Sequence, residues 1–124
     1  MTRRSPEHDL QVAVVAHLRA RRRSGVWFCA IPNEGKRSPV TAARMKARGL
    51  TPGAGDLILV IDGQAFALEL KHGRNKLTLA QVAQREAFRA AGGIWAEAYS
   101  LDEALFLLTR WKAIRPDASA RRAA

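Results

Sequence analysis

The sequence has little cysteine and no long apolar run. Its one cysteine, Cys29, excludes a disulfide framework and a zinc site built from cysteines, and it favours a reducing compartment. No apolar run reaches the roughly 20 residues that a bilayer crossing needs. The start of the chain also lacks the apolar stretch of a signal peptide. We therefore expect a cytoplasmic protein with no membrane segment.

Acidic residues are scarce. Asp and Glu number 11 against 21 Lys and Arg, which gives a formal net charge of +10 and a pI near 11.2. A domain this basic most often binds a polyanion, usually nucleic acid, because neutralising phosphates releases condensed counterions. The alternative is a charge that serves only solubility. With 124 residues, of which 48% are hydrophobic, one compact domain is expected.

Hydrophobic patterning and capping residues predict four helices and four strands. Helices are expected over residues 6–23, 39–48, 79–91 and 101–114, and strands over 26–31, 56–61, 64–71 and 94–99. The order predicts an α/β sandwich around a mixed sheet of about four strands. A single domain of residues 1–114 is expected, followed by a basic, disordered tail of residues 115–124.

The Asp62-Gly63 pair between two apolar runs predicts a two-residue hairpin turn. The strands then pair so that Asp56 falls opposite Glu69, with their Cβ atoms about 4.5–5.5 Å apart. Lys71 lies two residues further on and points to the same face. Opposed carboxylates repel each other, and a divalent metal ion with oxygen ligands would relieve that repulsion. The alternative is two surface carboxylates in an ordinary salt bridge with Lys71.

Glu7 offers a third carboxylate. At helical spacing it shares a stripe with the apolar residues Leu10, Val14 and Leu18. It can supply an acidic neighbour to a metal site, or it can simply complement the positive N-terminus of its helix.

The spacing of Asp56 and Glu69-Leu70-Lys71 resembles that of the PD-(D/E)XK nuclease superfamily. The small VRR-NUC domains are the most similar, and archaeal-type Holliday junction resolvases are more distantly similar. Further matches are "EHDLQ" on the first helix, "IPNEG" after the first strand, the glycine-rich run before Asp56, and "LTLAQ" after the motif. The resemblance covers roughly residues 7–100. Gly55 departs from the pattern, because the family often has proline before the aspartate.

The resemblance implies a restriction-endonuclease-like PD-(D/E)XK core and binding of Mg²⁺ or Mn²⁺. Asp56 and Glu69 would ligate the ion, assisted by the carbonyl of Leu70. Lys71 would position the attacking water and stabilise charge that develops on the phosphate. Glu7 would join the metal site through a water or as a second acid.

Gln81 has two interpretations. The resemblance implies that it orients Lys71 or contacts a backbone phosphate. Thr78-x-x-Gln81 is equally the pattern of a helix capping box.

Polar and basic residues flank the predicted metal site, and we expect many of them to contact backbone phosphates without reading sequence. Each one is alternatively a solvated surface charge. They are Asn33, Lys36 and Arg37 after the first strand, Arg44, Lys46 and Arg48 on the second helix, and Arg74 and Lys76 after the motif. Trp27 and Phe28 are expected in the core, with base stacking as the alternative. Trp95, Phe106 and Trp111 are also expected in the core, with a dimer seam as the alternative for some of them.

The predicted function is a metal-dependent DNA endonuclease that selects branched or junction DNA by structure more than by sequence. A homodimer is expected, because two symmetric sites cut both strands most simply. A phage or prophage origin follows by analogy, and with it a bacterial or phage-infected host cytoplasm. The rival hypothesis is a non-catalytic module that binds nucleic acid with the same basic face. A sequence-specific restriction enzyme is less favoured, because no extra recognition domain is evident.

Overall fold

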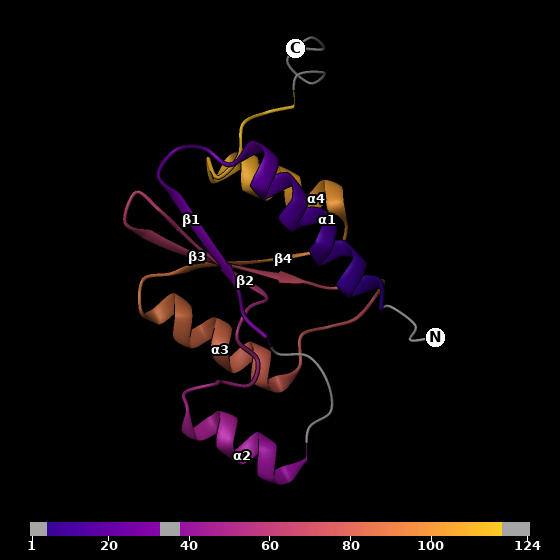
Figure 1. Ribbon diagram of the computed structural model, residues 1–124, viewed down its shortest axis with the longest axis vertical. Helices are drawn as coiled ribbons and strands as arrows, with labels where there is room; N and C mark the ends of the chain where they lie inside the picture. The colour runs from indigo at the N-terminus through magenta and orange to yellow at the C-terminus, as the bar shows by residue number, and fades with distance from the viewer. Residues whose placement is uncertain (1–4, 33–37, 118–124) are drawn as a thin grey trace.

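The computed structural model describes residues 5–32 and 38–117. Within these ranges the chain forms four helices and four strands in the predicted order (Figure 1). The elements are α1 (Pro6–Arg21), β1 (Val26–Ala30), α2 (Pro39–Ala47), β2 (Leu57–Ile61), β3 (Gln64–Leu70), α3 (Leu79–Ala90), β4 (Ile94–Ala98) and α4 (Leu101–Arg110). None of these four helices has the combination of length and apolar character that a membrane crossing requires.

The four strands form one mixed sheet in the order β1-β2-β3-β4. β1 and β3 both run antiparallel to β2, whereas β3 and β4 are parallel. The turn between β2 and β3 has positive φ at both Asp62 (51°) and Gly63 (78°), as a type I′ turn requires. Ile61 pairs with Gln64, so the predicted hairpin register is confirmed.

The two faces of the sheet have different coverings. α1 and α4 pack together over one face, and α3 lies against the other (Figure 1). Phe66, Leu68 and Leu70 alternate along β3 toward the α1–α4 face and join the hydrophobic core. The residues between them, including Glu69, therefore point to the face that α3 covers.

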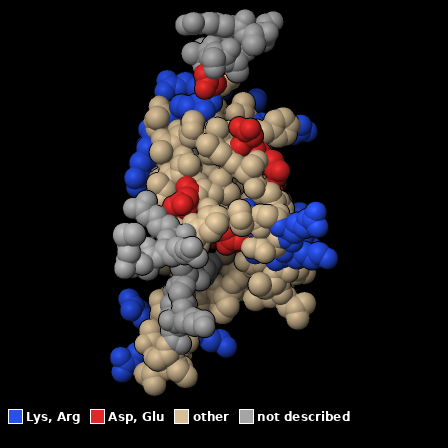
Figure 2. All heavy atoms as spheres, turned by 90° about the vertical axis from the view of Figure 1, so that its right-hand side faces the viewer, with Lys and Arg blue, Asp and Glu red and all other residues tan. Residues whose placement is uncertain are grey.

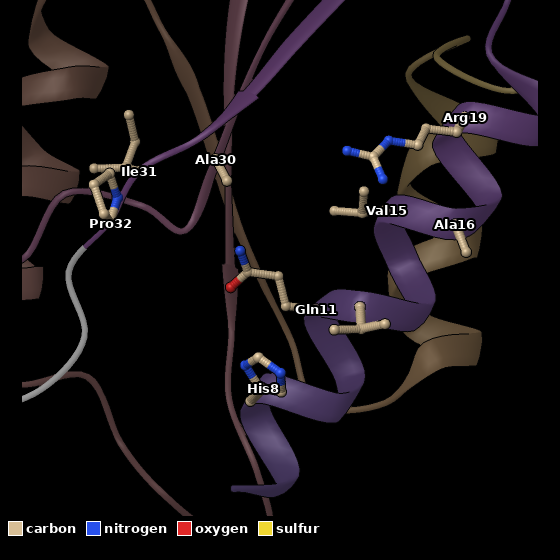
Figure 3. A pocket seen from close by; sticks show the side chains of 9 residues that line it. His8, Gln11, Val15, Ala16, Arg19, Ala30, Ile31 and Pro32 are labelled. Atoms are coloured by element: carbon tan, nitrogen blue, oxygen red, sulfur yellow. The ribbon is translucent and has the colours of Figure 1, made fainter. Parts of the chain in front are cut away.

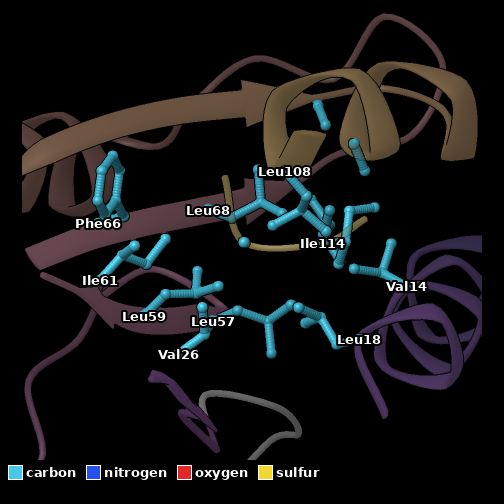
Figure 4. Packing of buried hydrophobic residues seen from close by; sticks show 14 residues of the cluster. Val14, Leu18, Val26, Leu57, Leu59, Ile61, Phe66, Leu68, Leu108 and Ile114 are labelled. Atoms are coloured by element: carbon cyan, nitrogen blue, oxygen red, sulfur yellow. The ribbon is translucent and has the colours of Figure 1, made fainter. Parts of the chain in front are cut away.

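The core lies between the sheet and the α1–α4 pair (Figure 4). Leu57, Leu59, Leu68 and Leu108 are fully buried there. Burying each such side chain stabilises the fold by roughly 1.5–3 kcal/mol relative to leaving it in water. This layer packs against one face of the β2–β3 hairpin, so polar groups can lie on the opposite face.

The last helix is shorter than expected. α4 ends at Arg110, not at residue 114, because Lys112 adopts a left-handed φ of 63° that turns the chain back. The turn brings Ile114 into the core and into a bridge with Arg22. Arg115, assigned by the sequence to the tail, donates its N–H to the Arg21 carbonyl at 3.0 Å. Residues 118–124 of the predicted tail lie outside the described residues.

The expectation of buried aromatic residues was right for some and wrong for others. Trp95 is buried, and Trp111 stacks on Phe66 with ring centroids 4.8 Å apart. Trp27 is 54% exposed and Phe106 is 63% exposed, so neither is a core residue. Strand alternation turns Trp27 away from buried Val26. Helical periodicity turns Phe106 away from the α4 residues that face the core.

Candidate active site

Asp56 stands immediately before β2 and is held by both neighbouring strands. Its backbone carbonyl accepts a hydrogen bond from Ile31 N at 2.9 Å, and its Oδ2 accepts one from Leu70 N at 2.8 Å. Leu57 pairs with Leu68, so continuing the same register places Asp56 opposite Glu69. The hairpin therefore brings the two predicted carboxylates together at one end of the sheet.

Glu69 is a buried acid with an incomplete set of partners. The residue is only 3% exposed, and its Oε1 accepts a hydrogen bond from Gln81 Nε2 at 2.8 Å. When both carboxylates are charged, the buried Oε2 has no hydrogen-bond donor among the described residues, whereas a proton shared with Asp56 would satisfy it. Leaving a buried polar atom without a partner costs about 1–3 kcal/mol, more if it is charged. This oxygen therefore favours a proton or a cation.

The pKa of Glu69 is raised from its ordinary value of 4.5 to about 8. Burial is the largest cause, because it disfavours the charged carboxylate, and the negative charge of Asp56 acts in the same direction. The ammonium of Lys71 opposes these effects but does not overcome them. Without a bound cation, the acid pair therefore keeps a proton to a higher pH than an exposed glutamate does.

Lys71 is buried beside the two acids, with only 6% of its surface exposed. Its Nζ donates to Gln81 Oε1 at 3.1 Å. The same Oε1 accepts the N–H of Thr78 at 2.8 Å, and Thr78 Oγ1 accepts the N–H of Gln81 at 3.1 Å. Gln81 thus completes the capping box of α3 and contacts both Lys71 and Glu69, so its two interpretations are compatible.

Gly53 sets how closely the glycine-rich loop approaches the start of α3. It has a positive φ of 84°, and a Cβ at this position would lie 2.5 Å from the carbonyl carbon and oxygen of Ala80 and 2.7 Å from Gln81 N. Only glycine allows this approach without displacing the helix. The glycine-rich run is evident in the sequence, but the contact is not, because spacing alone does not reveal which helix the loop touches.

Glu7 lies at the start of α1 and accepts a hydrogen bond from Asn75 Nδ2 at 3.4 Å, in the loop that follows Lys71. The described residues contain no group of three or more His, Cys, Asp or Glu side chains placed to hold a metal ion. Glu7 therefore does not join Asp56 and Glu69 in a three-acid cluster. Its predicted role through a bridging water stays a prediction.

Asp56 and Glu69 have the donor chemistry that suits a hard divalent cation, because both offer carboxylate oxygens. A divalent ion between the two carboxylates would bind the unpartnered Oε2 of Glu69 and would lower the pKa of this acid. Another acid lies one strand away, because Glu97 pairs in register with Glu69. Glu97 is bound by Arg85 at 3.3 Å, which balances its charge.

The predicted DNA-binding residues are distributed over α2 and the loop before α3. Arg44, Lys46 and Arg48 are exposed on α2 and at its C-terminal end, and Arg74 and Lys76 are exposed between β3 and α3. Figure 2 shows Lys and Arg side chains at the level of α2 and beside acidic side chains near the middle of that face. Asn33, Lys36 and Arg37 lie outside the described residues.

A cavity of about 600 Å³ lies between α1 and the end of β1 (Figure 3). Its lining includes His8, Gln11 and Arg19 on α1, together with Ile31. Ile31 is the residue whose N–H donates to the Asp56 backbone carbonyl, but Asp56 and Glu69 themselves do not line the cavity. Sequence reasoning did not single out His8 or Gln11 for this position. Helical spacing places them one turn apart, but it does not show which strand they face.

A search of solved structures found similarity to a chain described as a VRR_NUC domain protein. The TM-score is 0.67 with 21% sequence identity, and the match covers 94% of this chain and 96% of that chain. Neither the protein-family models nor the curated proteins gave a match. The structural likeness shows a shared fold, and the predicted fold class of a mixed four-stranded sheet flanked by helices is confirmed.

Proposed function

We propose that this protein is a metal-dependent nuclease that hydrolyses phosphodiester bonds in DNA, at a site formed by Asp56, Glu69 and Lys71. The observation that carries the proposal is the buried, unpartnered Oε2 of Glu69 beside Asp56. A fold that serves only to bind DNA gains nothing from a buried acid pair, because its negative charge would repel phosphate unless a proton or a cation neutralised it. An incoming Mg²⁺ or Mn²⁺ would turn the same pair into a binding site for the scissile phosphate.

Each residue has a distinct role in the proposed mechanism. When bound, the ion would supply Lewis-acid stabilisation of the phosphate and a more acidic water. The Leu70 N–H orients the Asp56 carboxylate, and the Gln81 amide orients Glu69. Lys71 carries an ammonium that would position the attacking water and stabilise charge developing on the phosphate oxygens. Gln81 Oε1 limits where that ammonium can point.

The substrate proposed is duplex or branched DNA, cut with structural selectivity more than sequence specificity. Exposed cations on α2 and in the loop before α3 favour contacts with the backbone, which carry no sequence information directly. A homodimer is proposed on the ground that two symmetric copies would present two sites to the two strands.

The decisive experiment is a cleavage panel with supercoiled plasmid, linear duplex, flap, splayed and four-way DNA, in Mg²⁺, Mn²⁺ or EDTA. Wild-type protein should cut at least one substrate, and only with the metal. Lys71→Ala and Asp56→Asn should lower the rate at least 100-fold. The amide introduced by Asp56→Asn keeps an oxygen for the Leu70 N–H, so the local fold is retained. Asp102→Asn is the matched control, because Asp102 is an exposed acid in the first turn of α4, and this variant should cut normally.

The alternative function is a non-catalytic DNA-binding module. The excess of basic residues favours a DNA-binding module as much as it favours a nuclease, because affinity for a polyanion does not require a metal. A binder would show salt-dependent affinity and no cleavage of any substrate in either metal. That outcome would end the nuclease proposal.

A further inference from the structure

α2 stands apart from the rest of the molecule. It buries none of its nine residues, and no extensive packing joins it to another helix or strand in the described ranges. In Figure 1 it lies beyond α3, at the opposite end of the molecule from α1 and α4. An isolated helix of this length is marginal in water, because the cost of nucleation is spread over few hydrogen bonds.

Local capping interactions, and not tertiary packing, stabilise α2. Ser38 Oγ accepts the Thr41 N–H at 3.1 Å at the N-terminus. At the other end, Gly49 has a φ of 97° and donates to Lys46 O at 3.0 Å, while Leu50 N donates to Met45 O at 2.9 Å. These last two bonds form a Schellman motif. Caps are worth about 1 kcal/mol each, so the helix is organised without being buried.

The charge of α2 is all of one sign. Residues 38–53 contain three cations and no Asp or Glu. Arg44 and Arg48 are four residues apart and share one face of the helix. Lys46 lies on the other side, where it lines a cavity of about 330 Å³ between α2 and the glycine-rich loop together with Met45 and Gly53. The two arginines therefore form an outward-facing stripe, which we call the Arg44–Arg48 stripe.

We propose that α2 is a preformed arm that binds the phosphate backbone of duplex DNA through the Arg44–Arg48 stripe, outside the scissile phosphate. This inference rests on the proposed function for its substrate, and it adds where the duplex is held. Charge complementarity favours a polyanion as the partner of this helix. A second copy of this chain carries a net charge of +10 and would bring like charge to the stripe. The loop after α2 reaches the start of α3 at Gly53, so the arm is anchored beside the residues that orient Lys71.

The test is equilibrium binding to a fluorescent 30-base-pair duplex by anisotropy, in EDTA and at several salt concentrations. Arg44→Ala/Arg48→Ala should weaken binding about tenfold near 0.15 M salt. It should also lower the slope of log affinity against log salt by about 1.8, because each phosphate contact contributes about 0.9. Arg44→Lys/Arg48→Lys keeps the charge and should retain the wild-type slope. Because the substituted positions are exposed, circular dichroism should show an unchanged fold.

The matched control is Arg23→Ala/Arg110→Ala, which removes the same charge from two exposed arginines at the α1–α4 end. This variant should lower the slope by less than about 0.5, well under the slope of one phosphate contact. Equal losses in the two double variants would overturn the proposal, since the effect would then be one of net charge. An unchanged slope in Arg44→Ala/Arg48→Ala would overturn it too, and a changed oligomeric mass with that unchanged slope would assign α2 to a protein contact instead.

Binding in EDTA separates this inference from the proposed function. If wild-type protein binds through the stripe but never cleaves, the arm stands and the nuclease proposal fails. If cleavage is metal-dependent and Arg44→Ala/Arg48→Ala binds and cuts as wild type does, the nuclease stands and the arm fails.

Discussion

Gln81 Nε2 lies 2.8 Å from Glu69 Oε1, which joins the first turn of α3 to the buried acid of β3. The oxygen of the same amide accepts the Lys71 ammonium and the Thr78 N–H. One side chain therefore caps a helix and orients two residues of the candidate site. The capping box restricts the rotamers of this amide, so its position relative to Lys71 and Glu69 is well defined.

The double role of Gln81 predicts a difference between two cap variants. Thr78→Ala removes the hydroxyl that accepts the Gln81 N–H, and should cost about 1 kcal/mol of unfolding free energy while cleavage stays within about twofold of wild type. Gln81→Ala loses the cap and the contacts to Lys71 and Glu69, so it should cost at least as much stability and lower cleavage at least tenfold. Urea unfolding and cleavage rates measure both. Equal activity in the two variants would show that Gln81 is only a cap.

The raised pKa of Glu69 predicts how the stability of the metal-free protein depends on pH. The folded protein holds a proton on Glu69 up to pH about 8, whereas the unfolded chain releases it near 4.5. This contribution to stability is therefore full below 4.5 and is lost as pH rises through 8, by at most about 5 kcal/mol. Urea unfolding in EDTA between pH 5 and 8.5 should show the fall. Glu69→Gln should largely remove it, and a wild-type slope in that variant would assign the effect elsewhere.

Divalent metal should reverse this instability, because the ion takes the place of the Glu69 proton. At a concentration ten times the Kd, Mg²⁺ or Mn²⁺ should stabilise the protein by about 1.4 kcal/mol. The apparent affinity should rise with pH between 6 and 8.5, since binding releases a proton. Thermal unfolding with and without metal measures both effects.

Asp56→Asn and Glu69→Gln should lose the stabilisation by metal. Glu97→Gln is the matched control, because Glu97 is the neighbour of Glu69 in the sheet but is bound by Arg85. This variant should keep the response to metal. If Glu69→Gln kept the response to metal and Glu97→Gln lost it, the ion would bind at Glu97 on β4, and the proposed site would be wrong.

Two glycines with the same backbone preference should respond differently to substitution by alanine. Gly49 and Gly53 both have positive φ, but a Cβ at Gly49 meets nothing within 4 Å, whereas one at Gly53 would overlap Ala80 and Gln81 N. Gly49→Ala should cost about 1 kcal/mol from backbone strain alone. Gly53→Ala should cost more and should also lower cleavage, because the start of α3 must shift. Cleavage at the wild-type rate in Gly53→Ala would show that the loop does not position Gln81.

Local signals predicted the elements well because local interactions decide them. Ser5, Thr78 and Ser100 each accept the N–H of the residue three positions on, as helix caps do. The Asp62-Gly63 turn set the register of β2 against β3, and with it the position of Asp56 relative to Glu69. A turn with two positive φ values restricts strand pairing enough to be read without a structure.

Exposure and helix ends were predicted less well, because both depend on distant residues. Trp27 and Phe106 are large and apolar, yet more than half of each residue is exposed. Trp111 and Lys112 continue a helical pattern, but the chain turns there so that Ile114 can enter the core. A hydrophobicity pattern records what a residue prefers and does not record whether the fold provides a covering surface.

The sequence alone determined the order of the elements, the basic charge and the pairing that sets Asp56 against Glu69, because turn geometry, caps and strand alternation act over a few residues. Only the tertiary structure decided that α3 brings Gln81 onto Lys71 and Glu69, and that Gly53 sets the position of that helix. It also decided that α2 stands apart. These are contacts between segments far apart along the chain, and they depend on how the packed layers meet.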